Sequence, residues 1–213
     1  MVTDFGQQHR YNFSFTAASL RPELMRIAAE IFLASDSWET AKERILATNA
    51  LQCQSTGSAV RQERELRQRL QLLTAAQLTL LVEAPAEDRA AMAWLAACKH
   101  SRFVFDFAAM VVREKLAAND PVLRLSDYES FVDLQAVSHP EMGGLTPSSK
   151  AKIRQVLFHM LGAAGLLSKG QGIGRIHRPV LSPASAQAIL SDNPRWLAGF
   201  LVPDAEIPNC GTP

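Results

Sequence analysis

The sequence predicts an all-α, mainly helical fold with one short β-hairpin near its C-terminal end. Ala and Leu, both strong helix formers, supply 31 and 26 of the 213 residues. Aromatic residues, which favour strands, number only 10 Phe, 3 Trp and 2 Tyr. Apolar residues also recur at helical spacing through most of the chain. We therefore expect a helical bundle over residues 1–120, followed by a smaller winged-helix-like domain with C-terminal helices over residues 121–213.

The first 120 residues divide into several expected elements. Tyr11, Phe13 and Phe15 alternate with polar residues, which indicates a short edge strand or an arm. Helices are expected after residues that cap or begin them, namely Ser19, Asp36 (with Glu39 as a capping box), Ser58, Thr74 and Pro85. Segments 86–99 and 102–118 are dense in apolar and aromatic residues, which is typical of core helices.

The second unit follows a turn signal at residues 119–121 and begins with a helix over about 127–137, capped by Ser126 and Glu129. Thr146 and Pro147 start the next helix, since Thr caps and Pro suits the first helical position. Its apolar stripe is the clearest in the chain and comprises Ile153, Val156, Leu157, Met160, Leu161 and Ala164. Gly165 is a suitable C-terminal cap. A glycine-rich hairpin over 166–177 and helices over 183–190 and 194–200 complete the chain.

Several classes of protein are excluded by composition. The longest uncharged runs, 70–82 and 155–168, are shorter than the about 20 apolar residues that a membrane-spanning helix needs. No basic start precedes an apolar run, so no signal peptide is indicated. Cys53, Cys98 and Cys210 are few, distant and odd in number, which fits neither a disulfide framework nor a zinc site. We expect a soluble cytoplasmic protein without metal or cofactor.

Charge is distributed unevenly, although the net charge is only +1. Residues 142–178 contain six Lys or Arg residues and no Asp or Glu. Two helices, a capped amphipathic helix and a glycine-rich hairpin also form the order of elements in a winged helix, whose third helix enters a DNA major groove. Cations against phosphates and amide groups against bases are what such a protein needs. The alternative is a small helical subdomain whose basic face is merely solvated.

The candidate DNA-binding residues lie on the third helix and on the hairpin. They are Lys150, Lys152, Arg154, Gln155, His159, Lys169, Arg175 and Arg178. Lys152, Gln155 and His159 recur at i, i+3 and i+7, on a face apart from the apolar stripe.

A second basic cluster comprises Arg61, Arg64, Arg67 and Arg69. Glu63 and Glu65 are interleaved with it, and Arg61–Glu65 and Glu65–Arg69 are i,i+4 pairs. We favour an exposed helix stabilised by its own ion pairs, with a secondary nucleic-acid site as the alternative.

Signals for catalysis are poor. Gly170, Gly172 and Gly174 lack the long strand and following helix of a phosphate loop. Asp106, Glu114 and Lys115 suggest a metal-dependent nuclease only weakly, because they lie in a helical pattern. The five histidines, His9, His100, His139, His159 and His177, have no metal-ligand spacing. The aromatic residues Trp38, Trp94, Phe103, Phe105 and Phe107 are more typical of a core than of a base-stacking platform. We predict no catalytic site.

An ordered series of stretches resembles the BrxA family of bacteriophage exclusion (BREX) defence systems. The stretches are 61–70, 94–99, 103–107, 113–115 and 152–167, and the resemblance spans roughly residues 11–202. It implies a non-enzymatic helical component encoded beside a methyltransferase, an ATPase and a phosphatase-like protein, with a fold like that of the antitermination protein NusB. It also implies binding to double-stranded DNA.

Three functions are consistent with these patterns. The first is a DNA-binding accessory protein that docks through residues 146–178. The second is a protein–protein scaffold whose basic face meets an acidic subunit of the defence complex. The third is RNA binding in the manner of NusB, through the Arg61–Arg69 helix. None of them involves a membrane or a small-molecule substrate.

Overall fold

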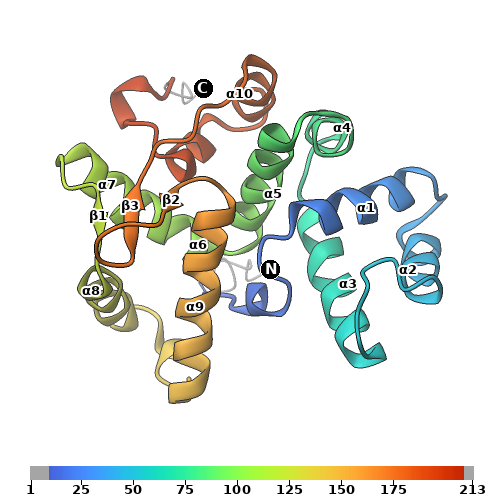
Figure 1. Cartoon of the computed structure of the whole chain (residues 1–213), viewed down its shortest axis with the longest axis horizontal. Coiled ribbons are helices and arrows are strands. Elements are labelled where there is room, and N and C mark those ends of the chain that lie inside the picture. Colours follow the sequence, from blue (N-terminus) through green and yellow to red (C-terminus); the bar gives the residue numbers. More distant parts are fainter. Residues whose placement is uncertain (1–9, 209–213) are drawn as a thin grey trace, which may run out of the picture.

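Helices dominate residues 10–208, the part of the chain that the computed structural model describes (Figure 1). The N-terminal helices are α1 (Pro22–Leu33), α2 (Trp38–Ala47), α3 (Thr56–Leu70), α4 (Ala75–Glu83) and α5 (Ala86–His100). A nearly continuous helical rod then comprises α6 (Arg102–Phe107), a π-helical turn η2 (Ala108–Val112) and α7 (Arg113–Ala117). The C-terminal helices are α8 (Leu125–Ala136), α9 (Pro147–Ala163) and α10 (Pro183–Leu190). The predicted mainly helical fold is confirmed.

Residues 10–208 also contain four 3₁₀ segments, one before α1, one between α8 and α9, and two after α10. They are η1 (Ser14–Ala17), η3 (Pro140–Met142), η4 (Pro194–Phe200) and η5 (Asp204–Glu206). Within residues 10–208, no helix combines the length and the apolar character that crossing a membrane requires.

The helix starts show where local capping signals suffice. Thr146 accepts a hydrogen bond from the Ser149 backbone N–H at 3.2 Å and Pro147 occupies the first turn, as predicted. Thr74 caps α4, also as predicted. Pro85 precedes α5, again as predicted. Four other expected caps are wrong. Helix α1 begins after Arg21 and not after Ser19. Ser37 caps α2 in place of Asp36, and Ser55 caps α3 in place of Ser58. Arg124 with Asp127 opens α8 in place of Ser126 with Glu129. Several polar residues near each start compete for the same role, and tertiary packing selects one.

A three-stranded antiparallel sheet has the order β1-β3-β2, with β1 (Val122–Leu123), β2 (Leu167–Ser168) and β3 (Gly174–Ile176). The β2–β3 hairpin was predicted, but β1 was not, since two residues carry no alternation signal. Gly174 is required there because a Cβ would lie 2.4 Å from the Ser168 carbonyl oxygen.

The N-terminal arm (residues 10–21) is not an edge strand. Tyr11 stacks on His139 with ring centroids 3.7 Å apart. Its hydroxyl donates to Asp106 and lies 2.9 Å from the side-chain oxygen of Gln135. Phe15 lies within η1 and is fully buried. The arm therefore crosses between helices that lie far apart in the sequence. The part of this prediction that concerns residues 1–9 lies outside the described residues.

The buried side chains form one continuous cluster that draws on both predicted units. Trp94 is fully buried and its indole N–H donates to the Gly199 carbonyl at 2.8 Å. Phe103 and Phe107 each meet Phe131 edge-on, across the predicted boundary near residue 120. The predicted core positions of Trp94, Phe103 and Phe107 are confirmed. The domain boundary near residue 120 stays a prediction.

Candidate nucleic-acid interface

Helix α9 has the two faces that its sequence predicts. Ile153, Val156, Leu157, Met160 and Leu161 are buried. Lys150, Lys152, Gln155 and His159 are exposed. The His159 ring also lies 3.1 Å from the Ser19 hydroxyl, measured from Nδ1, so the arm holds this side chain. The predicted helix register is confirmed.

Arg154 lies between these two faces and is half-buried. Burial raises the pKa of the neighbouring Tyr128 hydroxyl to about 12, and the positive charge of Arg154 opposes that rise. Arg154 is thus placed partly toward α8 and less fully toward solvent than Lys150 and Lys152.

The hairpin supplies two freely exposed cations. Lys169 follows β2 and Arg175 lies in β3, and both side chains are exposed. Arg178, predicted as a third, forms a two-point ion pair with Glu206, with nitrogen–oxygen distances of 3.1 and 2.5 Å. This pair raises the pKa of Arg178 and neutralises its charge. The sequence could not reveal the pair, because Glu206 belongs to a turn that returns to the hairpin from the end of the described chain.

Helix α3 differs from the predicted self-paired surface helix. Arg69 is fully buried and Glu65 is 3% exposed; they form an ion pair at 2.8 Å. Arg69 also donates to the carbonyl oxygens of Ser19 and Phe15, so it holds the N-terminal arm. The predicted Glu65–Arg69 pair is therefore confirmed, but its exposure is wrong. Arg69 is removed from the candidate nucleic-acid contacts, since a buried guanidinium has no access to phosphate.

The Glu65 carboxylate is stabilised in its charged form. Burial opposes ionisation, but a hydrogen bond from His100 and the charge of Arg69 outweigh it and lower the pKa of Glu65 to about 2. Arg67 pairs in turn with Glu63 at 2.7 Å. Both acidic residues on the inner face of α3 are therefore paired with arginines of the same helix.

Arg61 and Arg64 remain on the outer face of α3, and both are exposed. The predicted Arg61–Glu65 pair does not form, because Arg69 and His100 occupy that carboxylate. Within residues 10–208, neither Arg61 nor Arg64 has an acidic partner.

These two arginines share a cleft with Lys152 of α9. The cleft has a volume of about 480 Å³ and lies over η1, against which both α3 and α9 pack. Figure 1 shows the two helices on either side of the N-terminal arm. The lining residues are Ser14, Thr16, Ala17, Ser58, Arg61, Arg64, Glu65, Gln68 and Lys152. The structure thus brings residues of the two predicted basic clusters together at one cleft.

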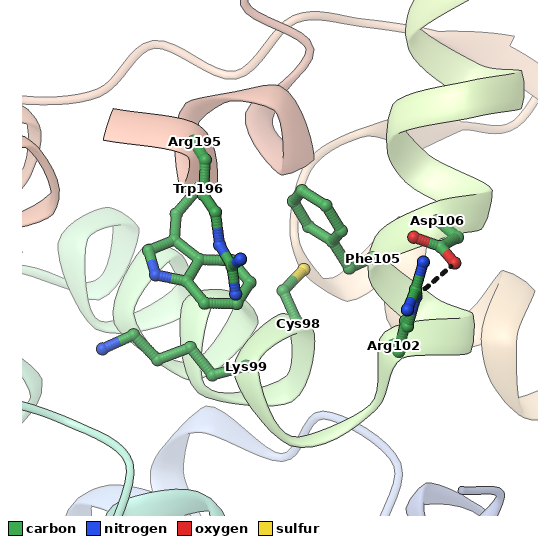
Figure 2. A pocket seen from close by; sticks show the side chains of 7 residues that line it. All are labelled: Cys98, Lys99, Arg102, Phe105, Asp106, Arg195 and Trp196. Carbon is green, nitrogen blue, oxygen red and sulfur yellow. Dashed lines mark hydrogen bonds and ion pairs between the residues drawn. The ribbon is translucent and has the colours of Figure 1, made fainter. Parts of the chain in front are cut away.

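A second pocket, of about 520 Å³, lies where α5 meets α6 and η4 (Figure 2). The Arg195 guanidinium lies 4.3 Å from the centre of the Trp196 ring. Asp106 accepts hydrogen bonds from Arg102 and from the Tyr11 hydroxyl. Asp106, the first carboxylate of the nuclease hypothesis, therefore links the N-terminal arm to α6.

The other nuclease candidates do not join Asp106. Glu114 pairs with Arg113 and lines a different pocket, between α7 and α8. Lys115 pairs with Asp120 and Asp127. Among the described residues, no three His, Cys, Asp or Glu side chains are grouped so that they could hold a metal ion.

Fold and surface together define a small, mainly helical protein with a hairpin-bearing C-terminal part and a basic cleft between two helices. The family model for BrxA matches residues 9–193. The chain belongs to the BrxA family, whose members are components of BREX phage-defence systems. The resemblance seen in the sequence is therefore confirmed.

The chain is similar to other BrxA proteins and to solved structures. The BREX protein BrxA of Escherichia coli O9:H4 (strain HS) is 31% identical over 140 residues, which span 66% of each chain. The BREX protein BrxA of Paramagnetospirillum magneticum (strain AMB-1) is 24% identical over 75% of this chain and 80% of its own. The crystal structure of an uncharacterized protein from Magnetospirillum magneticum matches with a TM-score of 0.79 at 20% identity, covering 90% of this chain and 98% of that one. This last likeness shows the fold alone.

Proposed function

We propose that the chain is a non-enzymatic accessory component of its defence system that binds double-stranded DNA through α9 and the β2–β3 hairpin. The observation that carries the proposal is the uncompensated positive charge of this surface. Between residues 142 and 178 there is no acidic side chain, and Lys150, Lys152, Lys169 and Arg175 are all exposed. A surface of this kind attracts a polyanion through the release of counterions.

The arrangement of elements supports the same proposal. A helical rod ending in α7, then β1, α8, α9 and the β2–β3 hairpin, with the sheet order β1-β3-β2, is the order of a winged helix. Helix α9 is about 25 Å long at 1.5 Å per residue, and a B-DNA major groove about 12 Å wide accepts a helix. Its N-terminal end extends at the edge of the molecule (Figure 1). The positive end of the helix dipole at that first turn adds to the attraction for phosphate.

Polar groups at the exposed face of α9 suit contact with base edges. Gln155 follows Lys152 by one turn on this face, and both are exposed. Amide side chains pair with adenine, whereas Lys and Arg side chains contact guanine or phosphate. Most of the cations lie outside this stripe, at the helix start and on the hairpin. We therefore expect binding that depends mainly on the DNA backbone and little on sequence.

The experiment is a titration of fluorescent duplex DNA with the purified protein at two salt concentrations, read by anisotropy. The test variant is Lys150→Ala/Lys152→Ala, which removes two exposed cations of α9. Each neutralised phosphate contributes about 0.9 to the slope of log affinity against log salt, so this variant should lower the slope by roughly 2. Weakening should be equal across unrelated DNA sequences.

The matched control is Lys42→Ala/Arg44→Ala, which removes two exposed cations from α2. It should bind DNA as the wild-type protein does. Wild-type protein that ignores duplex DNA at low salt would overturn the proposal and favour the scaffold function. Preference for single-stranded RNA in a competition titration would favour the RNA-binding function.

A further inference from the structure

We infer that the cleft between α3 and α9 is a phosphate-binding site that holds the sugar–phosphate backbone of a nucleic acid against both helices. The inference deepens the proposed function and rests on it for the identity of the ligand. Its basis is the convergence of Arg61, Arg64 and Lys152 on one cleft from segments that lie far apart in the sequence.

The three cations lack internal compensation. Arg61 and Arg64 are three residues apart, so they lie on the same face of α3. Within the described chain, neither they nor Lys152 has an acidic partner, although most other arginines of the protein do. Like charges that share a concave surface focus a positive potential there, and this potential attracts an anion.

The one acidic residue that lines the cleft does not cancel this potential. Glu65 is 3% exposed, and its carboxylate is bound by Arg69 at 2.8 Å and lies 3.4 Å from His100. Its charge is therefore balanced from behind by a fully buried guanidinium. The side of the cleft that faces solvent keeps the three cations and no accessible carboxylate among its lining residues.

Neutral polar groups complete the lining. Ser14, Thr16, Ser58 and Gln68 supply hydroxyl and amide groups of the kind that contact phosphate and sugar oxygens in nucleic-acid complexes. The Ser14 and Thr16 hydroxyls also bond to His100 and to the Phe13 carbonyl, which fixes their positions. Hydroxyl and amide groups therefore accompany the cations of both walls.

The N-terminal arm connects the two walls. Arg69 of α3 donates to two carbonyl oxygens of the arm, and His159 of α9 contacts the Ser19 hydroxyl. A site held in this way loses little entropy when an anion binds, and preorganisation of this kind favours affinity.

The size of the cleft favours a backbone over a free anion. Its volume is about 480 Å³, whereas one water molecule takes only about 30 Å³ in the liquid. A single inorganic phosphate would leave most of the cleft filled with water. A short length of nucleic-acid strand can contact α3 and α9 together.

The test uses the full chain and the variant Arg61→Ala/Arg64→Ala, with Lys42→Ala/Arg44→Ala as the control. Both pairs consist of exposed arginine or lysine residues, and circular dichroism melting should show both variants folded. Duplex DNA binding is measured against salt concentration. We expect Arg61→Ala/Arg64→Ala to lower the log–log slope by roughly 2 and the control to leave it unchanged.

A second arm titrates inorganic pyrophosphate into the same proteins, with thermal stability as the readout. If wild-type protein binds DNA and Arg61→Ala/Arg64→Ala binds it with the same slope, the inference is overturned while the proposed function stands. If wild-type protein does not bind DNA, the proposed function is wrong. The assignment of a nucleic-acid backbone as the ligand of the cleft is then wrong as well. In that case, stabilisation by pyrophosphate that the variant loses would identify a free phosphate compound as the ligand, and its absence would leave no phosphate site.

Discussion

Arg69 and Glu65 form an ion pair at 2.8 Å, with exposed fractions of only 0% and 3%. Breaking a buried pair by removing one partner leaves an uncompensated charge and typically costs about 3–5 kcal/mol. Because Arg69 also satisfies two carbonyl groups of the N-terminal arm, its removal leaves these acceptors unpaired as well.

We therefore predict that Arg69→Met lowers the free energy of unfolding by about 3–5 kcal/mol in a urea titration. Arg61→Met, on the exposed face of the same helix, should change it by no more than about 0.5 kcal/mol. Equal effects of the two substitutions would show that the assigned burial of Arg69 is wrong.

The same pair predicts how stability depends on pH. The pKa of Glu65 is lowered from its ordinary value of 4.5 to about 2, so the folded protein favours the ionised carboxylate. A depressed carboxyl pKa contributes stability that is fully present above the unfolded value and is lost as the pH falls through the folded one. The contribution of Glu65, about 3 kcal/mol, should therefore disappear between about pH 4.5 and pH 2.

Denaturant titrations over this pH range test the assignment. The loss of stability should be smaller in Glu65→Gln, which has no carboxyl group to protonate, although this variant should be less stable at neutral pH. An equal loss of stability in wild-type protein and in Glu65→Gln would show that other carboxylates cause the loss.

Core packing of α9 gives a third prediction. Leu157 is fully buried on the apolar face of this helix. Leu157→Ala should cost about 2–5 kcal/mol, because the transfer free energy is lost and a cavity remains. Gln155→Ala, exposed on the same helix, should fall within about 0.5 kcal/mol of wild type. Chemical denaturation followed by circular dichroism distinguishes the two; a cost below 1 kcal/mol for Leu157→Ala would contradict its burial.

A fourth prediction separates the two arginines of the hairpin region. Arg175 is exposed in β3, whereas Arg178 is already bound by Glu206. Arg175→Ala should lower the salt slope of DNA binding by roughly 1, and Arg178→Ala should change it less. Glu206→Gln releases Arg178 and should strengthen binding at low salt. Larger weakening by Arg178→Ala than by Arg175→Ala would show that the Glu206 pair opens on the DNA.

The fifth prediction concerns catalysis. Asp106 is engaged with Arg102 and Tyr11, and Glu114 lines a different pocket. Plasmid DNA incubated with the protein and magnesium or manganese should therefore remain intact. Cleavage that is lost in Asp106→Ala would overturn the proposal of a non-enzymatic component.

Much of the fold was predictable because strong local signals coincide with tertiary packing. Thr146, Pro147 and a six-residue apolar stripe define α9, and its bounds are those expected. The hairpin follows from glycine residues that the backbone needs. In contrast, β1 is only two residues long and acquires its identity from β3, with which it pairs.

The site was predicted in pieces, because charge patterns do not report burial. Glu65 and Arg69 have the i,i+4 spacing of a surface pair, yet the arm covers them. Arg61 and Arg64 differ from Arg69 only by their position around the helix. Arg61 and Arg64 share a cleft with Lys152 only because the folded chain places α3 near α9, which no local sequence pattern encodes.

The course of the N-terminal arm also sets an order of events during synthesis. The backbone N–H of Tyr11 donates to Glu141, which is 130 residues further along the chain. At about 5–20 residues per second, the ribosome needs on the order of ten seconds to produce that partner. Until then, Tyr11 and Phe15 have no C-terminal surface to cover, and α3 lacks its opposite wall. The basic cleft is therefore completed only after most of the polypeptide has emerged.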